Sequence, residues 1–317
     1  MAEIESAKFR EKIHQRVIRL MGNRFEITVV CDDAQWAANR IDEAVEEISR
    51  IEKLLTTFSD NSQTSFINEN AGIKAVHVDK EVFDLIQRSL KISDLTQGAF
   101  DITYGSIDKR FWNFDTSMTA LPDTKTAKQS VRLINYRNVM LNESDCTVFL
   151  KEKGMRIGFG GIGKGYAADK AKYIMQQKGV KSGIVNASGD LSAWGTQPNG
   201  MPWTIGVANP YTKITPFSYL DISNMSVATS GNYEKYAVVN GKKYSHTIDP
   251  KTGFPVEGIK SVTIVTLTAE LADAMATPVM VMGIKAGLNL INQMKNIACI
   301  IIDDHDSLYT SSNINIK

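Results

Sequence analysis

The glycine-rich stretch GFGGIGKG, residues 158–165, is the first place in this sequence where residue types and spacing could do chemistry. It matches two phosphate-binding patterns at once, G-x-G-x-x-G and G-x-x-x-x-G-K. A Walker loop needs Ser or Thr after the lysine to hold Mg²⁺, and Gly165 stands there instead. A Rossmann fingerprint opens a βαβ unit and is followed by an acidic residue about 20 residues on. Here one helix and then hairpins are expected, and Asp190 comes too late, so neither motif is assigned.

The stretch still predicts an anion-binding loop around Lys164. Five glycines let backbone N–H groups approach an anion closely. The helix predicted directly behind them turns the positive end of its dipole toward the same point. The alternative is an ordinary tight turn with a surface lysine, which is the more common meaning of an isolated Gly-rich loop.

A second candidate is His246 in the loop YSHTIDPKTGFP, residues 244–255. An imidazole can take a proton from a hydroxyl nucleophile near neutral pH. Asp249 precedes Pro250 in common turn chemistry, so its carboxylate could simply cap its own turn. A lone histidine is also more often structural or solvated than catalytic, and both alternatives stay open.

The third candidate is the nearly apolar segment ELADAMATPVMVMG, residues 270–283, in which Asp273 and Thr277 are four residues apart. On a helix this spacing places carboxylate and hydroxyl on one face. A buried carboxylate needs a partner, and the segment itself supplies no Lys or Arg. A hard cation such as Mg²⁺ would serve, although Asp273 could instead balance the helix dipole. Together the three candidates point to chemistry on a phosphate ester or anhydride.

The elements that must position these residues predict an α+β fold. Residues 25–31 alternate as a strand, and the next helix, reaching Leu55, can be capped by Asp32 or Asp33. Further helices are expected after a cap at Asp79, from Thr124 to about Ile134, over 166–177, over 269–282 and over 285–294. Short β-type runs fill 182–239, and two more strands flank the last helices. Because helices and antiparallel strands come in separate runs, we expect a single large domain of two lobes with mainly antiparallel strands and packed helices.

The composition excludes several classes of protein. The 317 residues are 43% hydrophobic and 22% charged, with 36 Lys+Arg against 35 Asp+Glu, so no basic footprint for nucleic acid exists. No apolar window is long enough to span a membrane. Three distant cysteines form neither a zinc pattern nor a disulfide framework. The charged N-terminus has no apolar core of a secretory signal, so the chain is expected to be either cytoplasmic or processed by removal of a leader.

Seven motifs resemble those of the ApbE-type flavin transferases and follow one another in the same order along the chain. These enzymes are FAD:protein FMN transferases. The motifs are MGNRFEITV (21–29), TTFSDNSQTSFIN (56–68), GAFDIT (98–103), GGIGKGYAADK (160–170), SVATSGNYEKY (226–236), YSHTIDPKTGFPV (244–256) and ADAMATPVMVMG (272–283). The resemblance runs from about Leu20 to Asp303. It implies an N-terminal extension over 1–19 followed by an ApbE-like domain over 20–317.

The resemblance also implies a reaction: FAD binds between two lobes, Mg²⁺ assists cleavage of its pyrophosphate, FMN passes to a Thr or Ser hydroxyl of an acceptor protein, and AMP leaves. The site residues that it implies share one of four roles. They are Met21 and Phe58 at the flavin; Ala99, Phe100 and Asp101 at the adenosine; Lys164 at the FAD phosphates, with a backbone contact from Thr247 to FAD; and Gly161, Asp273, Ala276 and Thr277 at the metal, where Gly161 and Ala276 act through their carbonyls. His246 becomes the candidate general base.

Two departures from the family pattern stand out. Gly158 replaces an aspartate that normally touches FAD, and Asn23 replaces the usual Thr of a Met-Gly-Thr start. We expect these two substitutions to affect flavin affinity more than the reaction. A Mg²⁺-dependent FAD pyrophosphatase would need the same site, and a non-catalytic FAD-binding protein remains a further alternative. Family members are commonly exported, which leaves the compartment open between periplasm and cytoplasm.

Overall fold

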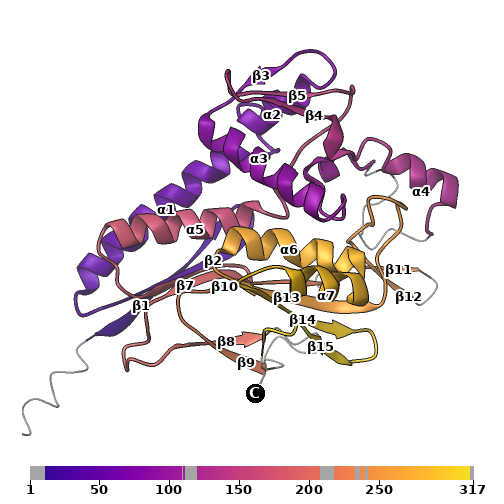
Figure 1. Cartoon of the computed structure of the whole chain (residues 1–317). Helices are drawn as coiled ribbons and strands as arrows, with labels where there is room; N and C mark the ends of the chain where they lie inside the picture. The colour runs from indigo at the N-terminus through magenta and orange to yellow at the C-terminus, as the bar shows by residue number, and fades with distance from the viewer. Residues whose placement is uncertain are drawn as a thin grey trace, which may run out of the picture.

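One antiparallel sheet of eight strands forms the base of the molecule (Figure 1). The computed structural model describes residues 11–108, 110, 120–207, 218–232, 236–239 and 242–314. The strands lie in the order β1-β2-β6-β7-β10-β13-β14-β15. Their bounds are β1 Lys12–Leu20, β2 Asn23–Cys31, β6 Gly183–Ala187, β7 Asp190–Trp194, β10 Ser226–Gly231, β13 Ile259–Thr266, β14 Ile297–Asp303 and β15 Leu308–Thr310.

Four helices cover one face of this sheet (Figure 1). They are α1 (Ala34–Leu55), α5 (Gly163–Gln177), α6 (Ala269–Met282) and α7 (Ile284–Gln293). Strand β2 shows why the main core forms here: alternate residues Phe25, Ile27 and Val29 are fully buried against the helical layer. Among the described residues, no helix combines the length and the apolar character needed to cross a membrane.

The opposite face of the sheet carries a smaller core. The hairpin of β8 (Trp203–Val207) and β9 (Ser218–Ile222) packs there, and its Trp203 belongs to one buried cluster with Leu191 and Val227 of the sheet. The two faces of each central strand are therefore both used, one by helices and one in part by this hairpin.

A second lobe lies beyond the helical layer (Figure 1). It contains α2 (Gln63–Glu69), α3 (Lys80–Leu95), α4 (Thr124–Ser130), the short 3₁₀ turns η1 (Ile102–Ser106) and η2 (Tyr136–Asn138), and a small sheet of β3 (Val76–His77), β5 (Thr147–Leu150) and β4 (Val139–Asn142). A separate hairpin is formed by β11 (Tyr236–Val239) and β12 (Lys242–Ser245). The α+β prediction, with antiparallel strands and two lobes, is confirmed.

Most predicted helices are present, but several bounds differ: α5 begins at Gly163 rather than Tyr166, and α7 spans Ile284–Gln293 rather than 285–294. Asp33 caps α1 by accepting the N–H groups of Gln35 and Trp36. Asp79 precedes α3 but makes no side-chain cap, because its carboxylate accepts the Gln63 amide instead. Helix α4 ends at Ser130, short of the predicted Ile134, and α2 was not predicted at all.

The sheet also begins earlier than the sequence suggested. Strand β1, except for its last residue, lies in the segment 1–19 assigned to an N-terminal extension. It pairs with β2 along its full length, from Lys12 opposite Cys31 to Leu20 opposite Asn23. Residues 1–10 of that segment lie outside the described residues. The first hairpin therefore belongs to the sheet and delivers its turn, Met21–Gly22, to the site described next.

Candidate functional site

A pocket of ≈ 690 Å³ lies where the glycine loop, the first hairpin turn and α6 meet. Its walls come from segments far apart in the chain. Most predicted site residues line it, namely Met21, Phe58, Gly158, Lys164, His246, Thr247, Asp273 and Thr277. The structure thus brings the three chemical candidates into one cavity.

The glycine loop is shaped by close packing at the start of α5. The helix begins at Gly163, and Lys164 stands in its first turn. A Cβ on Gly165 would lie 2.0 Å from the carbonyl oxygen of Ala269, so only glycine allows α5 and α6 to approach here. This contact sets Lys164 on α5 beside the predicted metal ligand on α6.

Lys164 lies between two buried carboxylates. Its Nζ forms an ion pair with Asp190 and is 3.6 Å from Oδ1 of Asp273. Oδ2 of Asp273 accepts the backbone N–H of Gly165 at 3.1 Å. The Asp190 and Asp273 side chains are 6% and 7% exposed, so the charges interact in a poorly solvated setting. Asp273 therefore has the cationic partner that its own helix lacks, supplied by α5.

Thr277 extends this centre by one helical turn. Its Oγ1 is 3.0 Å from Oγ of Ser230 in β10, and both residues line the pocket beside Asp273. Pro278 lies inside α6 directly after Thr277 and has no N–H to donate to the preceding turn. Asp273 and Thr277 both line the pocket, so the carboxylate and the hydroxyl lie on one face of α6, as their spacing predicts.

His246 and Thr247 reach the pocket from the loop after β12. The loop is held by several bonds: Thr247 N–H donates to Ser245, and Ile248 N–H donates to the Tyr104 hydroxyl at 3.1 Å. Burial raises the pKa of Tyr104 to about 12, which keeps that hydroxyl neutral. The rim of the pocket that carries His246 is therefore anchored to the second lobe.

The alternative assignment holds for Asp249. Its carboxylate accepts the N–H of Lys251 and the hydroxyl of Thr252, both within its own turn. Gly253 closes the turn with φ +75°, and a Cβ there would lie 2.1 Å from the Ala127 carbonyl oxygen. Asp249 is thus a structural residue of a turn that requires glycine.

The flavin-side candidates, Met21 and Phe58, form the mouth of the pocket. Met21 and Gly22 both have positive φ, 50° and 71°, as a two-residue hairpin turn requires. The Asn23 amide donates to the Met21 carbonyl at 2.8 Å, which gives this departure from the family pattern a local role. Phe58 is 94% exposed although it lines the cavity, so one aromatic face is open to a ligand.

Several residues implied by the resemblance do not line the pocket. Ala99, Phe100 and Asp101 are buried, and Phe100 packs behind the glycine loop against Gly161. Both carboxylate oxygens of Asp101 accept internal bonds, from Thr103 and from the Tyr136 N–H. Their expected contact with adenosine stays a prediction.

The two expected carbonyl ligands, Gly161 and Ala276, are likewise not among the pocket-lining residues. Each is next in sequence to a residue that lines the pocket: Gly161 follows Gly160, and Ala276 precedes Thr277. Their roles at a metal stay a prediction.

Sequence reasoning missed Asp190 and Ser230. Asp190 lies too far along the chain from the glycine loop to be the acidic residue of a Rossmann fingerprint, which is the role that the loop pattern suggests for it. The sequence signal is the Ser188-Gly189 dipeptide directly before it, which is typical of a turn. In the structure both residues of this turn have positive φ. Ser230 carried no signal beyond its place in a short β-type run.

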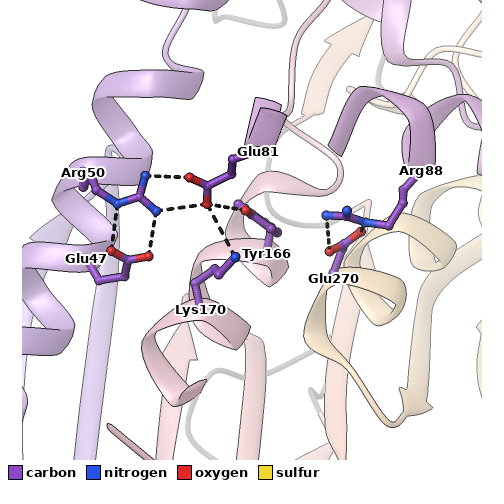
Figure 2. Close-up of polar contacts among 7 residues, drawn as sticks. All are labelled: Glu47, Arg50, Glu81, Arg88, Tyr166, Lys170 and Glu270. Carbon is purple, nitrogen blue, oxygen red and sulfur yellow. Dashed lines mark hydrogen bonds and ion pairs between the residues drawn. The ribbon is translucent and has the colours of Figure 1, made fainter. Parts of the chain in front are cut away.

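A network of charges holds the helices that carry the site. Figure 2 shows Arg50 of α1 bonded to Glu47 and to Glu81 of α3, while Glu81 also accepts the hydroxyl of Tyr166 on α5. The hydrogen bond from Arg50 is the main cause that lowers the pKa of Glu81 to about 2. Lys170 of α5 completes the cluster at 3.7 Å from Glu81.

Helix α6 is fixed separately at its N-terminus. Asp169 of α5 accepts the N–H groups of Ala269 and Glu270 at 3.0 and 2.9 Å. Arg88 of α3 forms a two-point ion pair with the Glu270 carboxylate (Figure 2). Because α3, α5 and α6 are tied at this end, the distance between Lys164 and Asp273 is set by the scaffold.

Comparisons with known proteins point to one family. Residues 21–301 match the model of the ApbE family. The chain is 31% identical over 267 residues to the FAD:protein FMN transferase of Klebsiella pneumoniae (strain 342), covering 84% of this chain and 82% of the relative. It is 27% identical over 304 residues to the FAD:protein FMN transferase of Escherichia coli (strain K12), covering 92% and 85%.

A solved structure extends the likeness to three dimensions. The crystal structure of the ApbE protein from Thermotoga maritima superposes with a TM-score of 0.86 at 28% identity, covering 95% of this chain and 97% of that one. Motifs, fold and family model coincide over nearly the whole sequence, and the chain belongs to the ApbE family.

Proposed function

We propose that this chain transfers FMN from FAD to a Thr or Ser hydroxyl of an acceptor protein and releases AMP, with a bound divalent cation. The observation that carries the proposal is the buried cluster of Lys164, Asp190 and Asp273 beside Thr277 in one pocket. With a divalent cation bound to its carboxylate, this cluster suits a pyrophosphate rather than an uncharged substrate. The names of the curated relatives support flavin transfer as the reaction.

The donor set fits a hard cation. The ionised Lys164, Asp190 and Asp273 side chains together carry one negative charge, so a cation is attracted although a lysine is present. Asp273 and Thr277 offer the oxygen ligands that Mg²⁺ prefers, and the carbonyls of Gly161 and Ala276 are the further ligands we propose. Mg²⁺ held there would supply positive charge to the pyrophosphate oxygens.

The pocket residues divide by the part of FAD they would contact. The open face of Phe58 and the side chain of Met21 are assigned to the flavin ring, since an aromatic face stacks on a flat heterocycle. Lys164 and the N-terminal turn of α5 are assigned to the phosphates. Thr247 is assigned to a backbone contact.

The proposed transfer forms one bond and breaks one. The acceptor oxygen bonds to the phosphorus of the FMN half, and the anhydride P–O bond to the AMP half breaks. The hydroxyl proton passes to the His246 imidazole, which lines the same pocket. Lys164 stabilises charge on the phosphates throughout, and AMP leaves as the anion.

The test is incubation with FAD, Mg²⁺ and candidate acceptor domains, followed by intact mass and nucleotide analysis. We expect one acceptor to gain the mass of FMN less water and AMP to appear in equal amount. FMN in place of FAD is the control, because it has no anhydride to cleave. Free FMN and AMP with unmodified acceptors would make the chain a pyrophosphatase, and intact FAD would make it a carrier.

A further inference from the structure

A second cavity of ≈ 480 Å³ lies on the face of the sheet opposite the helices. Glu26 and Thr28 line it, and they alternate along β2 with the residues that pack under α1. The floor comes from β1, β2, β6, β7 and β10, and one wall is the segment 203–206 of β8. We call this cavity the outer groove.

The outer groove meets the FAD pocket. Ser188 and Thr229 line both cavities. Ser188 stands two residues before Asp190, which pairs with Lys164, and Thr229 is the neighbour of Ser230, which bonds Thr277. The groove therefore meets the pocket beside the centre to which we assign the pyrophosphate.

The wall of the groove is an open strand edge. Residues Trp203 to Gly206 line it in an unbroken run. Because successive side chains of a strand point to opposite sides, such a run means that the edge of the strand faces the groove. Among the described residues, β8 pairs in a sheet only with β9, and none of the β9 residues lines the groove. An extended polypeptide can pair with an edge of this kind.

The floor fits a polypeptide better than a nucleotide. Side-chain amides and hydroxyls of Gln15, Thr28 and Asn186 alternate with apolar Ile184 and Leu191. Glu26 is the ionisable residue among those that line the groove, and its carboxylate is bonded by the Gln15 amide at 2.6 Å. Phosphate recognition uses cationic side chains, and the described lining has none.

We propose that the outer groove seats an extended segment of the acceptor protein, paired with the edge of β8, so that its Thr or Ser enters the FAD pocket between Ser188 and Thr229. This inference rests on the proposed function and specifies how the acceptor is recognised. It also assigns the two substrates to opposite faces of the sheet, which keeps the acceptor from competing with FAD for the flavin mouth.

The test fills the groove with one side chain. Gln15→Trp places an indole on the floor, at an exposed position of β1 where an aromatic residue suits the strand. Val17→Trp is the matched control, since Val17 is 51% exposed, lies two residues along the same face, and does not line the groove. The probe is an acceptor domain first shown by mass to gain FMN from the parent chain.

We expect Gln15→Trp to raise the KM for the acceptor about tenfold or more, through lost pairing with the strand edge, while FAD affinity stays unchanged. Val17→Trp should keep both parental values. Amide hydrogen exchange across β8 should also slow when the acceptor domain is added without FAD. An unchanged acceptor KM for Gln15→Trp, an equal rise in both variants, or β8 amides that exchange as before would overturn the inference. If no acceptor gains FMN from the parent chain, it is the proposed function that fails, and this inference fails with it.

Discussion

In Gly165→Ala, a gain in helix propensity opposes a steric clash between α5 and α6. Gly165 stands in the first turn of α5, where its missing side chain lets α6 approach. The added Cβ would lie 2.0 Å from the carbonyl oxygen and 2.4 Å from the carbonyl carbon of Ala269, and 2.8 Å from the Glu270 nitrogen. All three are backbone atoms, which cannot swing aside as the end of a side chain can.

The expected loss of stability follows from these distances. Helix propensity alone would make alanine about 1 kcal/mol more favourable than glycine. Relief of the clash requires α5 and α6 to separate, and overpacking of this kind costs up to about 3 kcal/mol. We therefore expect a net loss of about 2 kcal/mol in the free energy of unfolding. Separation of the helices should also weaken the bond from the Gly165 N–H to Asp273 and so reduce FAD cleavage.

Urea denaturation of the parent chain and the variant measures this loss. Gly160→Ala is the control for stability, because a Cβ at that glycine of the same loop would meet no atom within 4 Å. The control should unfold at the parental urea concentration. A Gly165→Ala chain as stable as the parent, or more stable, would show that propensity dominates and that the α5–α6 contact is not tight.

Three further predictions concern charge and proton transfer. Lys164→Ala should raise the KM for FAD more than it lowers turnover at saturation, as steady-state kinetics would show, because a cation at ground-state phosphates contributes mainly to binding. His246→Ala should slow single-turnover FMN transfer by at least about 10² with FAD affinity nearly kept, and a variant that transfers normally would remove the imidazole from the mechanism. Glu81→Gln should unfold more readily than the parent at neutral pH. Because Arg50 lowers the pKa of Glu81 from 4.5 to about 2, that stability is present above about pH 4.5 and is lost as the pH falls toward 2, so the two unfolding curves should converge in acid.

Local signals in the sequence were enough to predict the elements that carry the site. Helix α6 has the predicted bounds, Ala269–Met282, because its start and end are set locally: Thr268 caps its first turn and Gly283 follows its last residue. The cap at Asp33 likewise gave the start of α1. Strand β1 was missed because it lies at the edge of the sheet, where alternate residues are exposed and the Lys and Arg content hides the strand pattern.

The partners within the site could not be read from the chain. Lys164 is 26 residues from Asp190 and about a hundred from Asp273, and only the packing of α5 against β7 and α6 brings them together. A carboxylate that seemed to require a metal thus already has a lysine beside it. Asp101 differs from Asp273, because the resemblance implies that it contacts the ligand. In the structure its carboxylate accepts hydrogen bonds from Thr103 and Tyr136.

We propose that Asp273, beside Lys164, holds the cation that FAD cleavage requires. The measurement is AMP release from FAD as a function of Mg²⁺ concentration, for the parent chain and for Asp273→Ala, with unfolding curves to show that both are folded. We expect cleavage by the parent to rise and saturate with Mg²⁺, and the variant to stay inactive at concentrations that saturate the parent, because neutral oxygens alone do not offset the dehydration of Mg²⁺. Full cleavage by Asp273→Ala at ordinary Mg²⁺, or cleavage by the parent that is indifferent to chelation of the metal, would contradict the account.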